Sequence, residues 1–355
     1  MVFPTLEDVI ALRRRTAPDV LSDVLAALRL SGAVFFDNEA HSPWVSAAPT
    51  VAQIATFVLP ECERIVPFHM VTAGFCWLEI EGDPASSVRL ETGDVIIVAK
   101  GDEHFLSSAP GMRETQNLDD YRRVVERGAP VSLVANASAG GPETCHFICG
   151  YVGCDAQPFN PLLDALPRTV CARPPAESRE LLAMLVRAAI TESLTHGVGS
   201  VTMTVRMAEL MFVDVVRRHI EALPDGAHGW LAAVKDQHIG TALGVIHRRP
   251  TEAWTIEALA REAGLGRSAF AERFAATVGI PPMQYIARWR LQLAARLLGQ
   301  PNVSIAQAAT DVGYESEAAF KRAFKKYVGL PPGAWRKGRL SKATVELAIT
   351  QSADR

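Results

Sequence analysis

The sequence predicts an α+β multidomain protein. An N-terminal antiparallel β-barrel is followed by a helical connector and a C-terminal all-α part with two helix-turn-helix units. Three observations predict this order: short strand-like alternations between residues 31 and 107, two long amphipathic segments after residue 176, and an internal repeat in the C-terminal third. With 355 residues, 48% of them hydrophobic and 21% charged, the chain can bury more than one core and lacks the composition of a disordered protein.

Residues 1–175 are predicted to form the barrel domain. Segments such as "GFCWLEIEG" and "SVRLETGDVIIVAKGDEHFLSS" alternate or run apolar in short stretches that Gly, Asp and Pro interrupt. "VTAG" at 71–74 is expected to be a hairpin turn, and the Gly-Asp pair at 93–94 is expected to separate two strands. Residues 109–142 form a charged, glycine-bearing interruption, which we interpret as a surface loop, with a lid over a ligand pocket as the alternative.

The chain shows no targeting or membrane signal. Its N-terminus has no long apolar run and no small-residue cleavage site, and its arginines follow the apolar segment instead of preceding it. No window reaches the roughly 18 to 20 uninterrupted apolar residues that a membrane span requires. The sequence therefore predicts a cytoplasmic protein with no membrane partner.

Residues 176–230 are predicted to be a helical connector. "ESRELLAMLVRAAITESL" and "SVTMTVRMAELMFVDVVRRHIEALP" have apolar residues at helical spacing and are separated by "THGVGS". Their apolar stripes are wide enough to cover the barrel, and pairing with a second subunit in a homodimer is a further use for them. "LPDGAHGW" at 223–230 is the predicted domain boundary, because Pro and two Gly coincide with a shift in composition.

Residues 231–338 contain one structural unit twice, before a tail at 339–355. "TIEALAREAGLGRSAFAERFAATVGIPP" (255–282) aligns with "SIAQAATDVGYESEAAFKRAFKKYVGLPP" (304–332) at an offset of 49 residues before the turn and 50 after it. Gly264 falls on Gly313, and the second copy has one extra residue in its turn. Each copy is predicted to be a helix, a turn and a second helix that stops at glycine and proline. A continuous helix over 283–298, roughly 24 Å long, is predicted between them.

The second helix of each copy combines a buried aromatic face with an exposed face that suits DNA. Between Lys235 and Arg339 there are sixteen basic and eight acidic residues, a local balance of +8 in a chain whose net charge is −3. Small residues let a helix approach base edges, and Lys and Arg neutralise phosphates. The candidate DNA-binding residues are Arg267, Ser268, Ala271, Glu272 and Arg273 in the first copy, and Ser316, Glu317, Ala318, Lys321, Arg322 and Lys325 in the second. Glu272 is a candidate acceptor for a cytosine amino group or a solvated surface residue, and Arg273 is a phosphate contact or an ion-pair partner. The two recognition helices are expected about 34 Å apart, one turn of B-DNA.

The motifs "RLQLAARLL" and "IAQAATDVGYESEAAFKRAFKKYVGLPPGAWR" resemble the AraC/XylS transcriptional regulators over residues 235–338. The N-terminal pattern and "CHFICGYVGCDAQPFNPLLDALPRTV" resemble the cupin-like sensor domain of some of these regulators. The resemblance implies recognition helices at about residues 267–277 and 316–327. It also implies double-stranded promoter DNA, a small-molecule effector or oxidant and RNA polymerase as partners, and activation as the common mode of regulation.

The resemblance to cupins raises the question of whether histidines of the barrel bind a metal. His104 in "GDEHF" matches the second-motif histidine of enzymatic cupins, but the paired histidines of the first motif are missing and His69 stands alone. Three metal ligands cannot be assembled from this set, so we predict no metal and no cofactor. His69, Cys76, Trp77 and His104 are the candidate effector pocket, with hydrogen-bonded histidines in the barrel wall as the alternative for the two histidines. A cupin-type metal-dependent enzyme with an accessory helical domain is the competing function.

The six cysteines are interpreted as thiols. Cys145 and Cys149 lie on one expected strand, about 13 Å apart, so they cannot bond to each other or chelate one metal. Some relatives of this sensor type respond to reactive chlorine through cysteine oxidation, and the "CG" at 149–150 resembles a position in them. Cys149 and Cys145 are therefore the redox candidates, whereas Cys76 is expected to be a small buried residue.

Overall fold

The computed structural model describes residues 19–338 apart from 28–29, 116, 127–140, 155–157, 196 and 301. The expectations for the N-terminal segment, for residues 127–140 of the 109–142 interruption and for the tail at 339–355 lie outside these residues. The described part of that interruption contains a helix at Leu118–Glu126 where the sequence predicted a surface loop. The chain divides into two compact units. One, called here the β unit, contains Arg29–Ala156 and Leu166–Leu223; the other, the helical unit, contains Met1–Leu28, Gln157–Ala165 and Pro224–Arg355.

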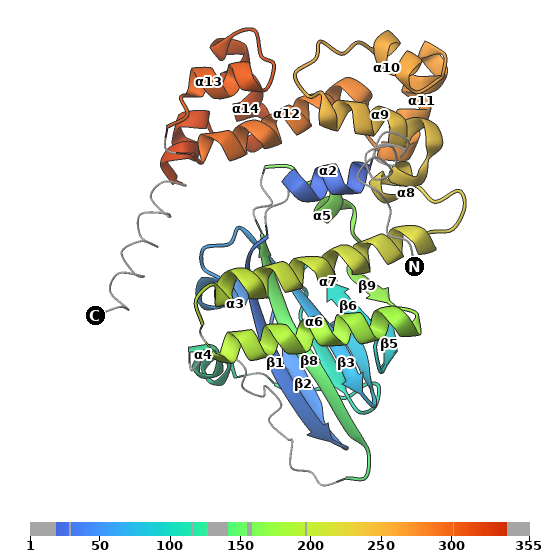
Figure 1. Cartoon of the computed structure of the whole chain (residues 1–355), viewed down its shortest axis with the longest axis vertical. Coiled ribbons are helices and arrows are strands. Elements are labelled where there is room, and N and C mark those ends of the chain that lie inside the picture. Colours follow the sequence, from blue (N-terminus) through green and yellow to red (C-terminus); the bar gives the residue numbers. More distant parts are fainter. Residues whose placement is uncertain are drawn as a thin grey trace, which may run out of the picture. The chain divides into compact units, whose positions relative to one another are not determined.

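The β unit contains two antiparallel sheets (Figure 1). The five-stranded sheet has the order β1 (Leu30–His41), β8 (Thr144–Cys154), β3 (Arg64–Ala73), β6 (Val95–Val98) and β9 (Thr169–Ala172). The four-stranded sheet has the order β2 (Val45–Ala48), β7 (His104–Ser107), β4 (Phe75–Ile80) and β5 (Asp83–Glu91). The predicted antiparallel β-domain is confirmed. Its strands form two separate hydrogen-bonded sheets that face each other across one apolar core instead of a closed ring.

The predicted hairpin at 71–74 is wrong. β3 pairs with β6 and β8, whereas β4 pairs with β5 and β7, so the chain changes sheets between Ala73 and Phe75. Gly74 has φ of 77° and a Cβ there would meet the Thr144 carbonyl oxygen at 2.3 Å, which explains why glycine occupies this corner. The Gly-Asp turn likewise separates two strands, β5 and β6, that belong to different sheets.

Helices cover the outer side of the five-stranded sheet (Figure 1). α6 (Ala176–Thr195) and α7 (Ser200–Ala222) pack on each other, α7 lies against β1 and β9, and α6 lies against β1. This confirms both predicted connector helices. The shorter helices α3 (Val51–Val58) and α4 (Leu118–Glu126) also belong to this unit. No helix in the described part of the chain is both long enough and apolar enough to cross a bilayer.

The C-terminal helices of the helical unit confirm the predicted repeat. Its elements are α8 (Trp230–Lys235), α9 (Gln237–Arg248), α10 (Ile256–Glu262), α11 (Arg267–Val278), α12 (Pro282–Leu298), α13 (Ile305–Asp311) and α14 (Glu317–Val328). Thr255 caps α10 and Ser304 caps α13, each accepting a hydrogen bond from the N–H three residues on. The turn glycines Gly264 and Gly313 have φ of 66° and 82°, a backbone region that favours glycine.

Two segments from the N-terminal half complete the helical unit. α2 (Val20–Ala27) packs against α9 with Val20 and Val24 fully buried, and α5 (Pro161–Ala165) packs against α8. The boundaries predicted from the sequence, 1–175 and 231–338, place both segments with the barrel. Sequence composition does not reveal which unit such a segment joins, because a buried apolar helix has the same composition in either core.

Candidate functional site

The second helix of each repeat has the two faces predicted for it. Phe270 and Phe274 on α11 and Phe320 and Phe324 on α14 are fully buried. Ser268 and Glu272 on α11 are exposed, as are Ala318, Lys321, Arg322 and Lys325 on α14, while Ala271 and Glu317 are partly buried. Ser316 is the N-cap of α14, where its side chain accepts a hydrogen bond from the Ala319 N–H. Each unit thus holds a helix by its aromatic side and leaves a polar face to solvent.

The candidate cations divide into paired and unpaired groups. Arg267 pairs with Glu257 at 2.8 Å, Arg273 with Asp236 at 2.6 Å, and Lys321 with Glu317 at 2.5 Å. Arg273 is therefore an ion-pair partner in this structure, and the carboxylate of its partner Asp236 also caps α9. Within the described residues, Arg322 and Lys325 have no ion-pair partner. These two side chains are available to a phosphate without breaking an existing contact.

Arg290 on α12 joins the two repeats, a role that the sequence did not predict. Its guanidinium donates to the carbonyl oxygens of Pro250 at 2.6 Å and Glu252 at 2.7 Å, before the first repeat, and to that of Gly313 at 3.2 Å, in the turn of the second. Three carbonyl acceptors on one guanidinium fix both loops to α12. A sequence shows one more basic residue on an amphipathic helix here, and nothing in it distinguishes Arg290 from the exposed arginines.

In the β unit, the structure brings three of the candidate sensor residues together. His69 on β3 stands directly opposite Cys149 on β8, and its Nδ1 lies 2.8 Å from the Cys149 Sγ. The His69 Nε2 lies 2.7 Å from the Nε2 of His104, which comes from the other sheet. The His104 Nδ1 lies 2.7 Å from the carbonyl oxygen of Asp102. These four groups form one continuous hydrogen-bonded chain between the two sheets.

With both rings neutral, one arrangement of protons satisfies this chain. A carbonyl can only accept, so His104 donates from Nδ1 to Asp102 and accepts at Nε2 from His69. His69 then accepts at Nδ1 from the Cys149 thiol. Burial lowers the pKa of His69 well below its ordinary value and lowers that of His104 to about 4, and burial raises the pKa of Cys149 well above its ordinary value. All three groups are therefore neutral at pH 7.

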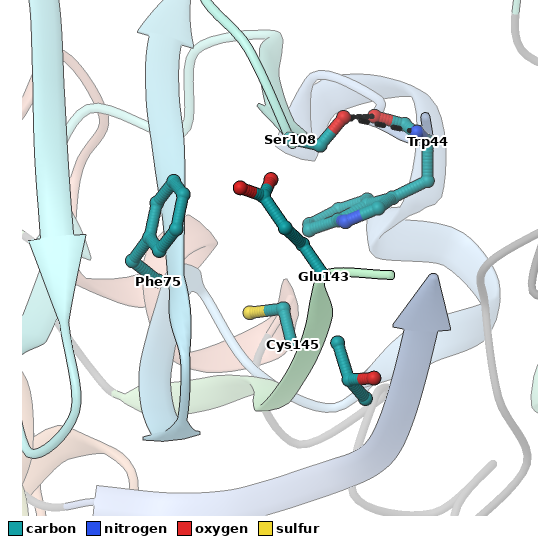
Figure 2. Close-up of a pocket in the computed structure, with 6 residues that line it drawn as sticks. Trp44, Phe75, Ser108, Glu143 and Cys145 are labelled. Carbon is teal, nitrogen blue, oxygen red and sulfur yellow. Dashed lines mark hydrogen bonds between the residues drawn. The ribbon is translucent and has the colours of Figure 1, made fainter. Parts of the chain in front are cut away.

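The two redox candidates have different partners. The Cys76 thiol is hydrogen-bonded to Cys145, a contact that together with burial raises the pKa of Cys76 well above its ordinary value. Figure 2 shows the Cys145 sulfur at a small pocket with Phe75, Trp44 and the carboxylate of Glu143. Cys145 and Cys149 both lie on strand β8, and both are buried thiols.

Trp77 does not join the predicted effector pocket. Cys76 lies in the core between the sheets, and successive residues of a strand point to opposite faces, so the neighbouring tryptophan is directed outward from β4. The cavity beside Cys149 and His69, lined also by Ser46, Tyr121 and Tyr151, has room for about one water molecule. Among the described residues, no cluster of three His, Cys, Asp or Glu side chains is arranged to hold a metal ion.

Comparisons with known proteins give the family. Residues 19–221 match the model of a cupin family, and residues 259–338 match that of a helix-turn-helix domain. An AraC-like transcription regulator of Streptomyces lividans is 34% identical over 320 residues, which cover 90% of this chain and 98% of that protein. One of Streptomyces antibioticus is 32% identical, again over 90% of this chain and 98% of the relative. The regulator AlkR of Acinetobacter baylyi is 30% identical over 69% of this chain and 79% of its own length. The chain therefore belongs to the AraC-like transcription regulators.

Proposed function

We propose that the chain is a one-component transcription regulator that binds promoter DNA through α11 and α14. The observation that carries this proposal is the repeated unit, in which two helices of equal length, each held by two buried phenylalanines, present polar faces. A helix of this kind fits the major groove, and two of them on one spine fit successive grooves. Selection of duplexes from a random pool by the purified chain tests this proposal, because a protein that does not bind DNA sequence-specifically enriches no sequence.

The β unit is proposed to carry the sensor, with the cluster of Cys76, Cys145, Cys149, His69 and His104 as its site. The small size of the cavity beside Cys149 favours an effector of few atoms over a metabolite, which would require the core to repack. A small oxidant such as hypochlorous acid meets this limit.

The oxidant is proposed to join Cys76 and Cys145 in a disulfide, because these two thiols are in contact. The two thiols lose two electrons and two protons, hypochlorous acid is reduced to chloride, and water and a proton are released. The Cys145→Ser variant tests this step. It should keep its DNA affinity when hypochlorous acid changes that of the wild type, and an equal response of both proteins would exclude this disulfide as the signal.

A homodimer is proposed to form through the exposed side of α6 and α7. Leu181 and Met184 on α6 and Leu210 on α7 are 58%, 63% and 56% exposed, on helices whose opposite sides cover the sheet. Large apolar side chains exposed on one layer of helices are typical of an interface with another protein chain. Activation through contact with RNA polymerase is proposed on the family resemblance alone.

A further inference from the structure

We propose that Pro158–Ala165, called here the strap, is a docked segment that sets the geometry of both recognition helices. The strap is the connection between β8 and β9, and it belongs to the helical unit. It docks on α12, the helix that separates the two repeats, and on α8. This inference rests on the proposed DNA binding, which it deepens by naming the element that controls it.

Phe159 makes the central contacts of the strap. Its backbone N–H donates to the side-chain oxygen of Gln292 at 2.9 Å, and its ring meets that of Tyr285 edge-on at 5.9 Å between centroids. The guanidinium of Arg288 lies 5.8 Å from the same ring. Gln292 is 5% exposed, and a buried amide is costly unless it is hydrogen-bonded. The partner that the strap supplies explains why a glutamine occupies the buried side of α12.

The rest of the strap is built to stay in place. Asn160 is 3% exposed, and its side chain accepts a hydrogen bond from the Leu163 N–H at 3.0 Å, which starts the single turn of α5. Leu162 and Leu163 are fully buried where α5 packs against α8. Removing these two leucine side chains from water stabilises the docked state.

Phe159 is linked to each recognition helix through one residue of α12. The Tyr285 ring also meets Phe274 of α11 at 5.8 Å. The Arg288 guanidinium also lies 5.9 Å from the ring of Tyr327, in the last turn of α14. One side chain of the strap thus contacts two residues of α12, of which Tyr285 touches α11 and Arg288 touches α14. Docking of the strap therefore constrains the position of each helix relative to the other.

The strap is covalently tied to the proposed sensor strand. β8 ends at Cys154 and the strap begins at Pro158, so three residues join them, and three more join its end at Ala165 to β9 at Thr169. Three intervening residues span at most roughly 14 Å when fully extended. β8 carries both Cys145 and Cys149. A rearrangement of β8 therefore acts on the strap, and it changes DNA affinity to the extent that docked and released states bind DNA differently.

The test compares full-length Phe159→Ala with Met283→Ala, a matched control that shortens an exposed apolar side chain on α12 itself. Both are measured on a selected duplex with two half-sites and on duplexes that keep one half-site. When one recognition helix is bound, the other is held near its half-site at a high effective concentration, which falls if the helices are no longer fixed relative to each other. Phe159→Ala should therefore bind the two-site duplex about tenfold more weakly, whereas its affinity for each single half-site should not change. It should also tolerate an extra base pair between the half-sites. Equal losses on both kinds of duplex, or no loss on either, would overturn the inference.

Hydrogen exchange without DNA separates this inference from the proposed function. Phe159→Ala should exchange faster than the wild type at the amides of α5 and of the last turn of α14, while Met283→Ala should match the wild type at both places. Unchanged exchange at both places overturns the inference that the strap fixes the recognition helices, even if the chain binds no DNA. Phe159→Leu keeps the apolar burial and loses the ring contacts to Tyr285 and Arg288, so it replaces Phe159→Ala in both experiments if the alanine variant does not fold.

Discussion

Replacing the two equivalent turn glycines should have unequal costs, because their surroundings differ. Gly264 and Gly313 both have left-handed backbone, so alanine at either position costs about 1–2 kcal/mol in conformational strain. A Cβ at Gly264 has its nearest neighbour, the His238 Nδ1, at 4.0 Å, whereas a Cβ at Gly313 lies 3.0 Å from both Cα and the carbonyl oxygen of Thr251. Those are backbone atoms and cannot swing aside, which adds about 1–3 kcal/mol. We therefore expect about 1–2 kcal/mol for Gly264→Ala and about 2–5 kcal/mol for Gly313→Ala.

Hydrogen exchange measures these costs within each repeat, since a two-unit chain does not unfold in one step. The opening free energy of α13 and α14 amides should fall in Gly313→Ala, and that of α10 and α11 amides should fall less in Gly264→Ala. Gly329→Ala is a further control, because Gly329 has φ of 85° and nothing lies within 4 Å of its Cβ position. Equal losses in all three variants would refute the claim that the second turn packs against the Thr251 loop.

Three other substitutions test the DNA-binding face of α14, the proposed dimer interface and the buried histidine pair. Arg322→Ala should weaken DNA binding and make the slope of log affinity against log salt shallower by about 0.9, as anisotropy titrations at several salt concentrations would show; an unchanged slope would remove Arg322 from the phosphate contacts. Met184→Glu should convert a dimer to a monomer in sedimentation at micromolar concentration, and a monomeric wild type would remove the proposed interface. Burial lowers the pKa of folded His104 to about 4 from its ordinary value of 6.5, so the unfolded chain takes up the proton first. Protonation of His104 therefore does not lower the free energy of unfolding above pH 6.5, and it lowers that free energy by about 3 kcal/mol as the pH drops to 4. Urea unfolding of the β unit at several pH values should show a smaller fall in His104→Gln, and identical profiles would contradict this.

The sequence was sufficient for the helical repeat because its signals are local. Aligned glycines at the turns and the N-cap residues Thr255 and Ser304 each specify backbone geometry within a few residues. The extra residue predicted in the second turn also appears, since four residues separate α10 from α11 and five separate α13 from α14. Residue periodicity likewise predicted which face of α14 is buried.

Partners that are distant in the sequence could not be predicted in this way. Strand alternation shows that Cys76 and Cys145 each face a core, but not that they face one another across two sheets. The same alternation, applied to Trp77, would have excluded it from a pocket that contains its neighbour. Phe159 and Gln292 are 133 residues apart, and a glutamine on a helix does not reveal which backbone N–H it will receive.

Chemical footprinting of the full chain on its selected duplex shows whether α11 and α14 enter two successive major grooves. Two recognition helices on one spine should protect two major-groove segments on one face of the duplex, with centres one helical turn, about 10–10.5 base pairs, apart. A half-turn insertion between the segments should abolish one of the two protections. Protection of a single groove segment by the whole chain, or protection without sequence preference, would contradict the account.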